Sequence, residues 1–150
     1  MITFYIYGEG ADLARRILGR ACSLSGFEVQ DLYASIGYVK IDKGPLLSKD
    51  IPEPDIILAP DKKASIKTKD PSIVIVNSVQ KIAYKKGVKC HYLDADKIAN
   101  TTNADLSIVM LGALTKVFSK LSLKNMREAI RVECGEDKIT GLEEGFRAVR

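Results

Sequence analysis

The sequence predicts an α/β fold, in which a Rossmann-like, mostly parallel sheet is flanked by helices and followed by a helical C-terminal third. Three observations predict it. A hydrophobic strand over residues 2–7 breaks at two glycines and leads into an amphipathic helix. Two continuous apolar runs, at 55–60 and 72–77, are typical of parallel strands that are covered on both faces. From Ala104 onward, apolar residues recur at helical spacing.

The first half of the chain alternates between strand and helix patterns. Residues 12–25 predict a helix, because apolar side chains recur on one face until a glycine follows. Residues 27–32 predict a second short strand, and residues 37–41 an extended segment ahead of a Gly-Pro turn. After the two central apolar runs, residues 88–93 predict a last strand. We therefore expect about five strands, give or take one.

The C-terminal third predicts three helices. The first has one apolar stripe at i, i+4 and i+7 spacing, formed by Leu106, Met110, Ala113, Leu114, Val117 and Leu121. Asn103 lies just ahead of this helix, where we expect it to act as a cap. Ser122 is a suitable N-cap for the second helix, which ends at Gly135, and apolar residues between Ile139 and Val149 mark the third.

Length and composition indicate one ordinary globular domain, residues 1–150. The chain is 46% hydrophobic and 28% charged, which is close to the globular average. The net charge of +4 comes from scattered lysines rather than one basic stripe, which argues against a nucleic-acid partner. No apolar run is long enough for a membrane span, and the N-terminus has no signal-like segment, so we expect no membrane partner and a cytoplasmic location.

Cysteine and histidine usage excludes several kinds of site. Cys22, Cys90 and Cys134 are odd in number and form no C-x-x-C pair, so this chain alone provides neither a disulfide framework nor a cysteine-ligated zinc or iron-sulfur site. We expect them to be buried thiols that pack as small hydrophobes. His91 is the only histidine and lies within a predicted strand, so no catalytic residue and no metal ligand is assigned.

The glycine turn is the first candidate binding site. Gly8 and Gly10 follow the first strand, where backbone N–H groups at a helix N-terminus can approach a phosphate. The alternative is a tight turn with no ligand, because Glu9 and Asp12 place negative charge at the same position. Asp31 lies about 20 residues beyond the glycines, where a dinucleotide-binding domain has the acid that binds a ribose.

Asn77 is the last candidate binding residue. It closes the apolar run at 72–77 and places a small polar group at the end of a strand, where it could line a cleft. Capping or turn formation explains the same residue equally well.

Several of these segments together resemble one family. The glycine turn and helix at 8–26, the strands at 55–60 and 72–77 and the helix containing 110–114 are similar to the gamma subunit, or gamma domain, of the 2-oxoacid:ferredoxin oxidoreductases. These enzymes act on pyruvate, 2-oxoglutarate, branched 2-oxoacids or indolepyruvate. Residues 142–148 also resemble the terminal helix of that family. The resemblance covers nearly the whole chain, although two of the family's four glycines are missing from the first turn.

The resemblance implies a subunit that is not catalytic alone. Its partners would be the alpha, beta and delta-type subunits, which carry thiamine diphosphate and the iron-sulfur clusters and perform the decarboxylation and electron transfer to ferredoxin. This chain would shape the assembly and bind no cofactor tightly. The family's gamma part is associated with handling coenzyme A, for which Gly8 and Gly10 are the positions to test.

Two other interpretations remain open at this point. One is a free-standing dinucleotide-binding protein that uses Gly8, Gly10 and Asp31 for a nicotinamide or flavin nucleotide. The other is a pure interaction module without a small-molecule ligand.

Overall fold

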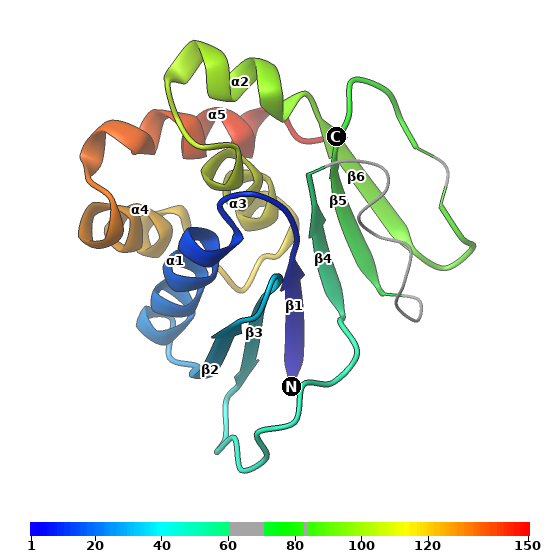
Figure 1. Cartoon of the computed structure of the whole chain (residues 1–150), viewed down its shortest axis with the longest axis vertical. Helices are drawn as coiled ribbons and strands as arrows, with labels where there is room; N and C mark the ends of the chain where they lie inside the picture. The colour runs from blue at the N-terminus through cyan, green and yellow to red at the C-terminus, as the bar shows by residue number, and fades with distance from the viewer. Residues whose placement is uncertain (61–70, 83) are drawn as a thin grey trace.

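The computed structural model describes residues 1–60, 71–82 and 84–150, and in them six strands form one mixed sheet (Figure 1). The strand order is β2-β3-β1-β4-β5-β6. The strand β3 runs in the direction opposite to the other five strands, which all run in the same direction. The predicted α/β class with a mostly parallel sheet is confirmed. The strands are β1 Ile2–Ile6, β2 Glu28–Tyr33, β3 Gly37–Asp42, β4 Ile56–Ala59, β5 Ile73–Asn77 and β6 Lys89–Leu93.

The extended segment expected at 37–41 is the strand β3, and it changes the topology. It returns from β2 as a hairpin and pairs with β1, so that Ile2 lies opposite Ile41 and Ile6 opposite Gly37. As a result, β2 is an edge strand and does not touch β1. In a dinucleotide-binding domain of the usual strand order, the second strand lies directly beside the first.

Helices cover one face of this sheet. In Figure 1, α1 lies over β1–β3, while α3 lies beside the parallel strands and packs on β5. The helices α4 and α5 form a further layer outside α1 and α3, and α2 packs on α3 and α5. The helices are α1 Ala11–Leu24, α2 Ala95–Thr102, α3 Leu106–Val117, α4 Leu123–Glu133 and α5 Ile139–Ala148, with a short 3-10 helix at Glu136–Lys138. The predicted helical C-terminal third is therefore confirmed.

The helix α2 was not predicted, and it corrects the role expected for Asn103. Asn103 is the C-cap of α2 in the left-handed conformation, with φ 52° and ψ 40°, whereas Asp105 is the N-cap of α3. Asparagine adopts this conformation more readily than most residues. The sequence pattern concealed α2 because the helix has only eight residues, which is too short for its apolar positions to repeat over several turns.

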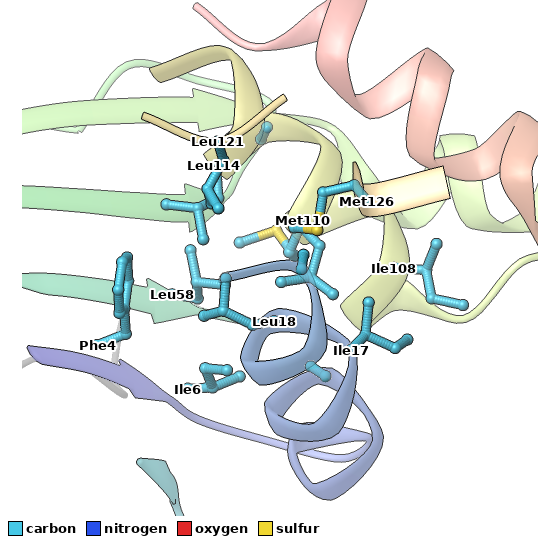
Figure 2. Packing of buried hydrophobic residues seen from close by; sticks show 14 of the residues in the cluster. Phe4, Ile6, Ile17, Leu18, Leu58, Ile108, Met110, Leu114, Leu121 and Met126 are labelled. Atoms are coloured by element: carbon cyan, nitrogen blue, oxygen red, sulfur yellow. The ribbon is translucent and has the colours of Figure 1, made fainter. Parts of the chain in front are cut away.

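The main core lies between the helices and the sheet. Phe4 and Ile6 of β1 point toward α1, where Ile17 and Leu18 are fully buried, and Leu58 of β4 joins them (Figure 2). The helix α3 passes through this core and is buried almost all round, which explains its mostly apolar sequence. The ring of Phe118, just after α3, packs edge-on against Phe4 with centroids 5.5 Å apart.

Two glycines allow α3 and α5 to touch backbone to backbone. A Cβ atom on Gly112 would lie 2.0 Å from the carbonyl oxygen of Leu142, and one on Gly145 would lie 2.1 Å from that of Val109. Any side chain at either position would push the two helices apart. The glycine in the 110–114 segment is thus required by packing.

The opposite face of the sheet has a second, smaller core. Ile57, Ala59, Val74 and Val76 of β4 and β5 are buried there. The partly buried side chains that pack against them include Tyr5 of β1, Tyr7 just after it, and Ile82, Tyr84 and Val88. In the described residues, no helix combines the length and apolar character needed to cross a lipid bilayer.

Candidate functional site at the carboxyl ends of the strands

The parallel strands β1, β4, β5 and β6 all end at the same edge of the sheet (Figure 1). After β1 the chain turns through Gly8 and Gly10 into α1, and after β4 it reaches Pro60. The chain leaves β1 through α1 toward β2 and β3, which lie on one side of β1, whereas β4 lies on the opposite side of β1. The strand order therefore reverses between β1 and β4. Open α/β sheets bind ligands in the crevice at such a point.

Both glycines of this turn have backbone angles that favour glycine. Gly8 has φ 92° and Gly10, the N-cap of α1, has φ 82°. A Cβ atom on Gly8 would also lie 2.5 Å from Cγ of Pro60. The amides of Ala11 and Ala14 donate to the carbonyl oxygens of Gly8 and Gly10, at 3.2 and 3.0 Å, which closes the turn. Turn geometry alone therefore requires both glycines.

Ser107 lies against this turn, and the sequence analysis did not identify it. It occupies the first turn of α3, is only 7% exposed, and its Oγ has no hydrogen-bond partner among the described residues. Beside it is a cavity of about 10 Å³, which Ser107 lines together with Glu9, Pro60 and apolar neighbours. A cavity of that size holds about one water molecule. The only sequence signal was a hydroxyl near the start of a mostly apolar helix.

The N-termini of α1 and α3 meet at this point. A Cβ atom on Gly10 would lie 2.8 Å from Oγ of Ser107. Among described groups, the amides of Glu9 and Gly10 donate no hydrogen bond. Unpaired amides and two positive helix ends favour an anion. The negative charge of Glu9 disfavours an anion here. The charge of Asp12 is neutralised by Arg15, whose guanidinium donates a hydrogen bond to the Asp12 carboxyl and lowers its pKa.

The structure separates Asp31 from the glycine turn. Through the register of β2, β3 and β1, Asp31 lies level with Val39 and Phe4, two strands away from β1 and short of its carboxyl end. Its carboxylate lies 3.4 Å from Nη1 of Arg15, and a Cβ atom on Gly19 would lie 3.0 Å from its Oδ2. Asp31 thus contacts the side of α1 rather than the space in front of Gly8.

Asn77 is engaged with the N-terminus of α2. Its Oδ1 accepts hydrogen bonds from the amides of Ala95 and Asp96, at 2.9 and 3.4 Å, and its Nδ2 donates to Oδ2 of Asp96 at 2.9 Å. Asn77 therefore caps α2 from the end of a neighbouring strand, with both ends of its amide in use.

The cysteines show no sign of activation. Burial raises the pKa of the Cys22 thiol to about 12, and it also raises the pKa values of Cys90 and Cys134, which are partly buried. A reactive cysteine needs a lowered pKa. Within the described residues, no three His, Cys, Asp or Glu side chains gather closely enough to hold a metal ion.

Comparison with known proteins identifies relatives along the whole chain. Residues 6–150 match the family model for pyruvate ferredoxin/flavodoxin oxidoreductase. The fold is similar to that of pyruvate oxidoreductase subunit PORC from Thermotoga maritima, with a TM-score of 0.80 and 20% identity over 99% of this chain and 97% of that one. It is also similar to the gamma subunit of a keto/oxoacid ferredoxin oxidoreductase from Geobacter sulfurreducens, with a TM-score of 0.76 and 21% identity over 97% of this chain and 95% of that one.

A third similar structure is much longer than this chain. It is 2-oxoglutarate:ferredoxin oxidoreductase from Magnetococcus marinus, solved with 2-oxoglutarate, coenzyme A and succinyl-CoA bound. The TM-score is 0.75 at 18% identity, and the match covers 97% of this chain but 30% of that one. No curated protein matches the sequence. Because the family model spans residues 6–150, the chain belongs to the pyruvate ferredoxin/flavodoxin oxidoreductase family.

Proposed function

We propose that this chain is the gamma-type subunit of a multi-subunit 2-oxoacid:ferredoxin oxidoreductase. One observation supports this most strongly: the chain matches a PORC subunit over 97% of that subunit's length, and the Magnetococcus enzyme over 30% of a much longer chain. A unit of this size corresponds to one part of such an enzyme. In this role the chain shapes the assembly, while oxidative decarboxylation occurs on other chains.

The partners in this proposal are alpha, beta and delta-type subunits that hold thiamine diphosphate and iron-sulfur clusters. Large apolar side chains that are exposed on this chain suit such an assembly, because a partner subunit can bury them. Leu47, on the segment that follows β3, is 91% exposed, and Val79, after β5, is 71% exposed. The three free cysteines suit a reducing compartment, which supports a cytoplasmic location.

The test is reconstitution with the neighbouring chains of the same organism. The alpha, beta and delta-type chains are co-expressed with and without this chain, and ferredoxin reduction is measured with pyruvate, 2-oxoglutarate, a branched 2-oxoacid and indolepyruvate. We expect a stable complex and 2-oxoacid-dependent reduction only when this chain is present. A complex of unchanged activity that forms without this chain would refute the proposal.

Coenzyme A is the ligand proposed for the glycine turn. A phosphate group would lie at the mouth of the turn, in front of the amides of Glu9 and Gly10 and the first turn of α3, because the cavity beside Ser107 is too small for it. The hydroxyl of Ser107 has no other partner among the described residues and is the side chain best placed to donate to it. Neither Asp31 nor Asn77 takes part, since both are engaged elsewhere.

Calorimetric titration of the assembled complex with coenzyme A tests this assignment. We expect Ser107→Ala to weaken binding by about ten-fold, the usual loss for a hydrogen bond to a charged group. Ser23→Ala, an exposed serine on α1, is the matched control and should leave binding unchanged. Equal affinity in both variants would place coenzyme A elsewhere. Titration with NAD, NADP and FAD tests the alternative of a dinucleotide-binding protein. We expect no saturable binding, because Asp31 contacts α1 rather than the glycine turn.

A further inference from the structure

A second cavity lies on the face of the sheet that the helices leave open. It has a volume of about 500 Å³ and is lined by residues of the strands β1–β3 and of the segment 49–52. That segment is part of the loop that follows β3 (Figure 1). Cavities of this volume are typical of sites for small molecules. The residues of the glycine turn do not line it, so it is separate from the site described above.

Three polar side chains form a row across the floor of this cavity. Thr3 of β1 is the direct partner of Lys40 in β3, and Lys40 is the direct partner of Gln30 in β2. Their neighbours Phe4, Val39 and Ile41 belong to the helix-side core, so the alternation of a strand places the three polar side chains on the other face. Directly opposed side chains are close enough to act on one ligand group.

Lys40 is a buried cation that forms no ion pair with the described residues. It is only 7% exposed, and its Nζ donates to the carbonyl oxygens of Ser48 and Asp50 at 2.6 and 2.9 Å. An ammonium group has three N–H bonds, so one remains. Among described groups, no carboxylate forms an ion pair with it, although buried lysines are usually paired. The remaining N–H and the uncompensated charge both favour an anionic ligand.

Thr3 adds an unpartnered hydroxyl beside this cation. Its side chain lines the cavity, the residue is 1% exposed, and Oγ1 makes no hydrogen bond to the described residues. Leaving a hydroxyl buried and unpaired is costly. Two hydrogen bonds with Asp55 hold the strand in place at this residue: the amide of Thr3 donates to Oδ2 of Asp55 at 2.9 Å, and the carbonyl oxygen of Thr3 accepts from the amide of Asp55 at 2.8 Å.

Apolar side chains form a second part of the cavity lining. Tyr38 and Leu32 are paired one row further along β3 and β2, and Ile51 and Pro52 line the cavity from the loop. The Tyr38 ring packs edge-on against Tyr5 with centroids 4.8 Å apart. A hydrogen bond of 2.7 Å from the Tyr5 hydroxyl to the carbonyl of Pro52 holds the loop in place.

We propose that this cavity binds a small organic carboxylate with an apolar body. The carboxylate accepts hydrogen bonds from Nζ of Lys40 and Oγ1 of Thr3, and the body packs against Tyr38, Leu32 and Ile51. Among the charged residues that line the cavity, Lys49 and Asp50 are exposed and of opposite sign, and Asp31 is paired with Arg15. The carboxylate of Asp55 also lies beside Thr3, where it accepts the hydrogen bond of the Thr3 amide. The proposal concerns this chain alone and does not depend on its assembly into an oxidoreductase.

The test is an NMR titration of the isotope-labelled full chain with phenylacetate, indole-3-acetate and 4-methylpentanoate. Each acid has a carboxylate and an apolar body. We expect at least one of them to give saturable shifts, at up to about 10 mM ligand, centred on β1, β3 and the 49–52 segment. Two matched ligands separate the contributions: phenylacetamide lacks the charge and acetate lacks the apolar body, and neither should saturate.

Two variants test the assigned contacts. Thr3→Val keeps the shape of the side chain and should weaken binding by about ten-fold or more. Lys40→Met keeps the apolar stem and should abolish saturation. Their matched controls are Thr115→Val, whose hydroxyl bonds to Leu111 within α3, and Lys124→Met, an exposed residue of α4; neither should change binding.

Lys40 also holds the loop, so the fold of Lys40→Met is checked by the NMR spectrum of the free protein. If that variant fails to fold, Thr3→Val and the amide ligand decide the question. The proposal is overturned if none of the three acids saturates, if phenylacetamide binds as well as phenylacetate, or if Thr3→Val binds like the wild type.

Discussion

Gly10 and Ser107 lie so close that a Cβ atom on the glycine would be 2.8 Å from the serine Oγ. The two residues are far apart in the sequence, yet they join the start of α1 to the start of α3. The contact leaves no room for a side chain at Gly10, which also has a positive φ of 82°. Two independent effects therefore require glycine here, and they can be separated by experiment.

We expect Gly10→Ala to lower the free energy of unfolding by more than the roughly 1–2 kcal/mol that positive φ costs an alanine. In a Ser107→Ala background the oxygen is gone and only the contact with the Cβ of residue 107 at 3.3 Å remains, so the same substitution should cost less. Urea unfolding of the four proteins in this cycle measures the difference. Gly44→Ala, where nothing lies within 4 Å of the added carbon, should stay within about 0.5 kcal/mol of wild type. Equal costs in both backgrounds would contradict the contact.

Where α3 and α5 cross, we expect glycine-to-alanine substitutions to destabilise the protein, although alanine is the better helix former. Replacing a helical glycine with alanine ordinarily stabilises by about 0.5–1 kcal/mol. At Gly112 and Gly145 the new carbon would fall about 2 Å from a backbone oxygen of the other helix. We expect each alanine variant to lose at least about 3 kcal/mol in thermal or urea unfolding, or to fail to fold. A gain in stability at either position would show that the helices do not cross as described.

Asn77→Ala should destabilise the protein without affecting ligand binding. The substitution removes the hydrogen bonds to the amides of Ala95 and Asp96, which is expected to cost about 1 kcal/mol. Hydrogen exchange should accelerate in the first turn of α2 and remain unchanged in α3. A loss of coenzyme A affinity without faster exchange would instead make Asn77 a binding residue.

Thiol reactivity should distinguish the three cysteines. Cys22 is fully buried in α1 and its pKa is raised to about 12, whereas Cys90 and Cys134 are partly exposed. At pH 8 a disulfide reagent should therefore titrate Cys90 and Cys134 in the native protein and Cys22 only after unfolding. Mass spectrometry of the labelled peptides identifies the sites. Labelling of Cys22 at the rate of the other two would contradict its position in the core.

We expect the ionised carboxylate of Asp42 to stabilise the folded protein, and this contribution to be lost in acid. Hydrogen bonds from the amides of Gly44 and Lys43 to its Oδ1 lower the pKa of this carboxyl in the folded state. A lowered folded pKa means that the contribution is present above the unfolded pKa of about 3.9 and is lost as the pH falls through the folded pKa. Urea unfolding from pH 7 to pH 2 should show Asp42→Asn less stable than wild type above pH 5, with the difference shrinking below about pH 4. A difference that is constant over the whole range would contradict this assignment.

Most elements of the fold could be predicted from local patterns. The central strands β4 and β5 are continuous apolar runs, and the amphipathic pattern of α1 follows the first strand directly. Each pattern arises because the element must bury one face or both, which leaves a period in the sequence. The helix α2 escaped detection because its eight residues are too few to repeat such a period clearly.

The candidate site was only partly predictable. Gly8 and Gly10 could be identified, since a strand that breaks at glycines before a helix is a local signal. Asp31 was chosen by its distance along the chain, but the hairpin places β3 between β2 and β1 and moves it two strands away. Ser107 reaches the turn only through the packing of α3, which no local pattern reports.

The sequence by itself determined which segments of this protein become strands and helices, because hydrophobic periodicity and turn residues act over a few neighbouring positions. Tertiary structure alone decided where β3 inserts, which cap Asn77 forms, and that Thr3, Lys40 and Gln30 stand in one row. These relationships depend on strand register and on contacts between residues distant in the chain. They are selected by the burial of the whole core rather than by any one segment.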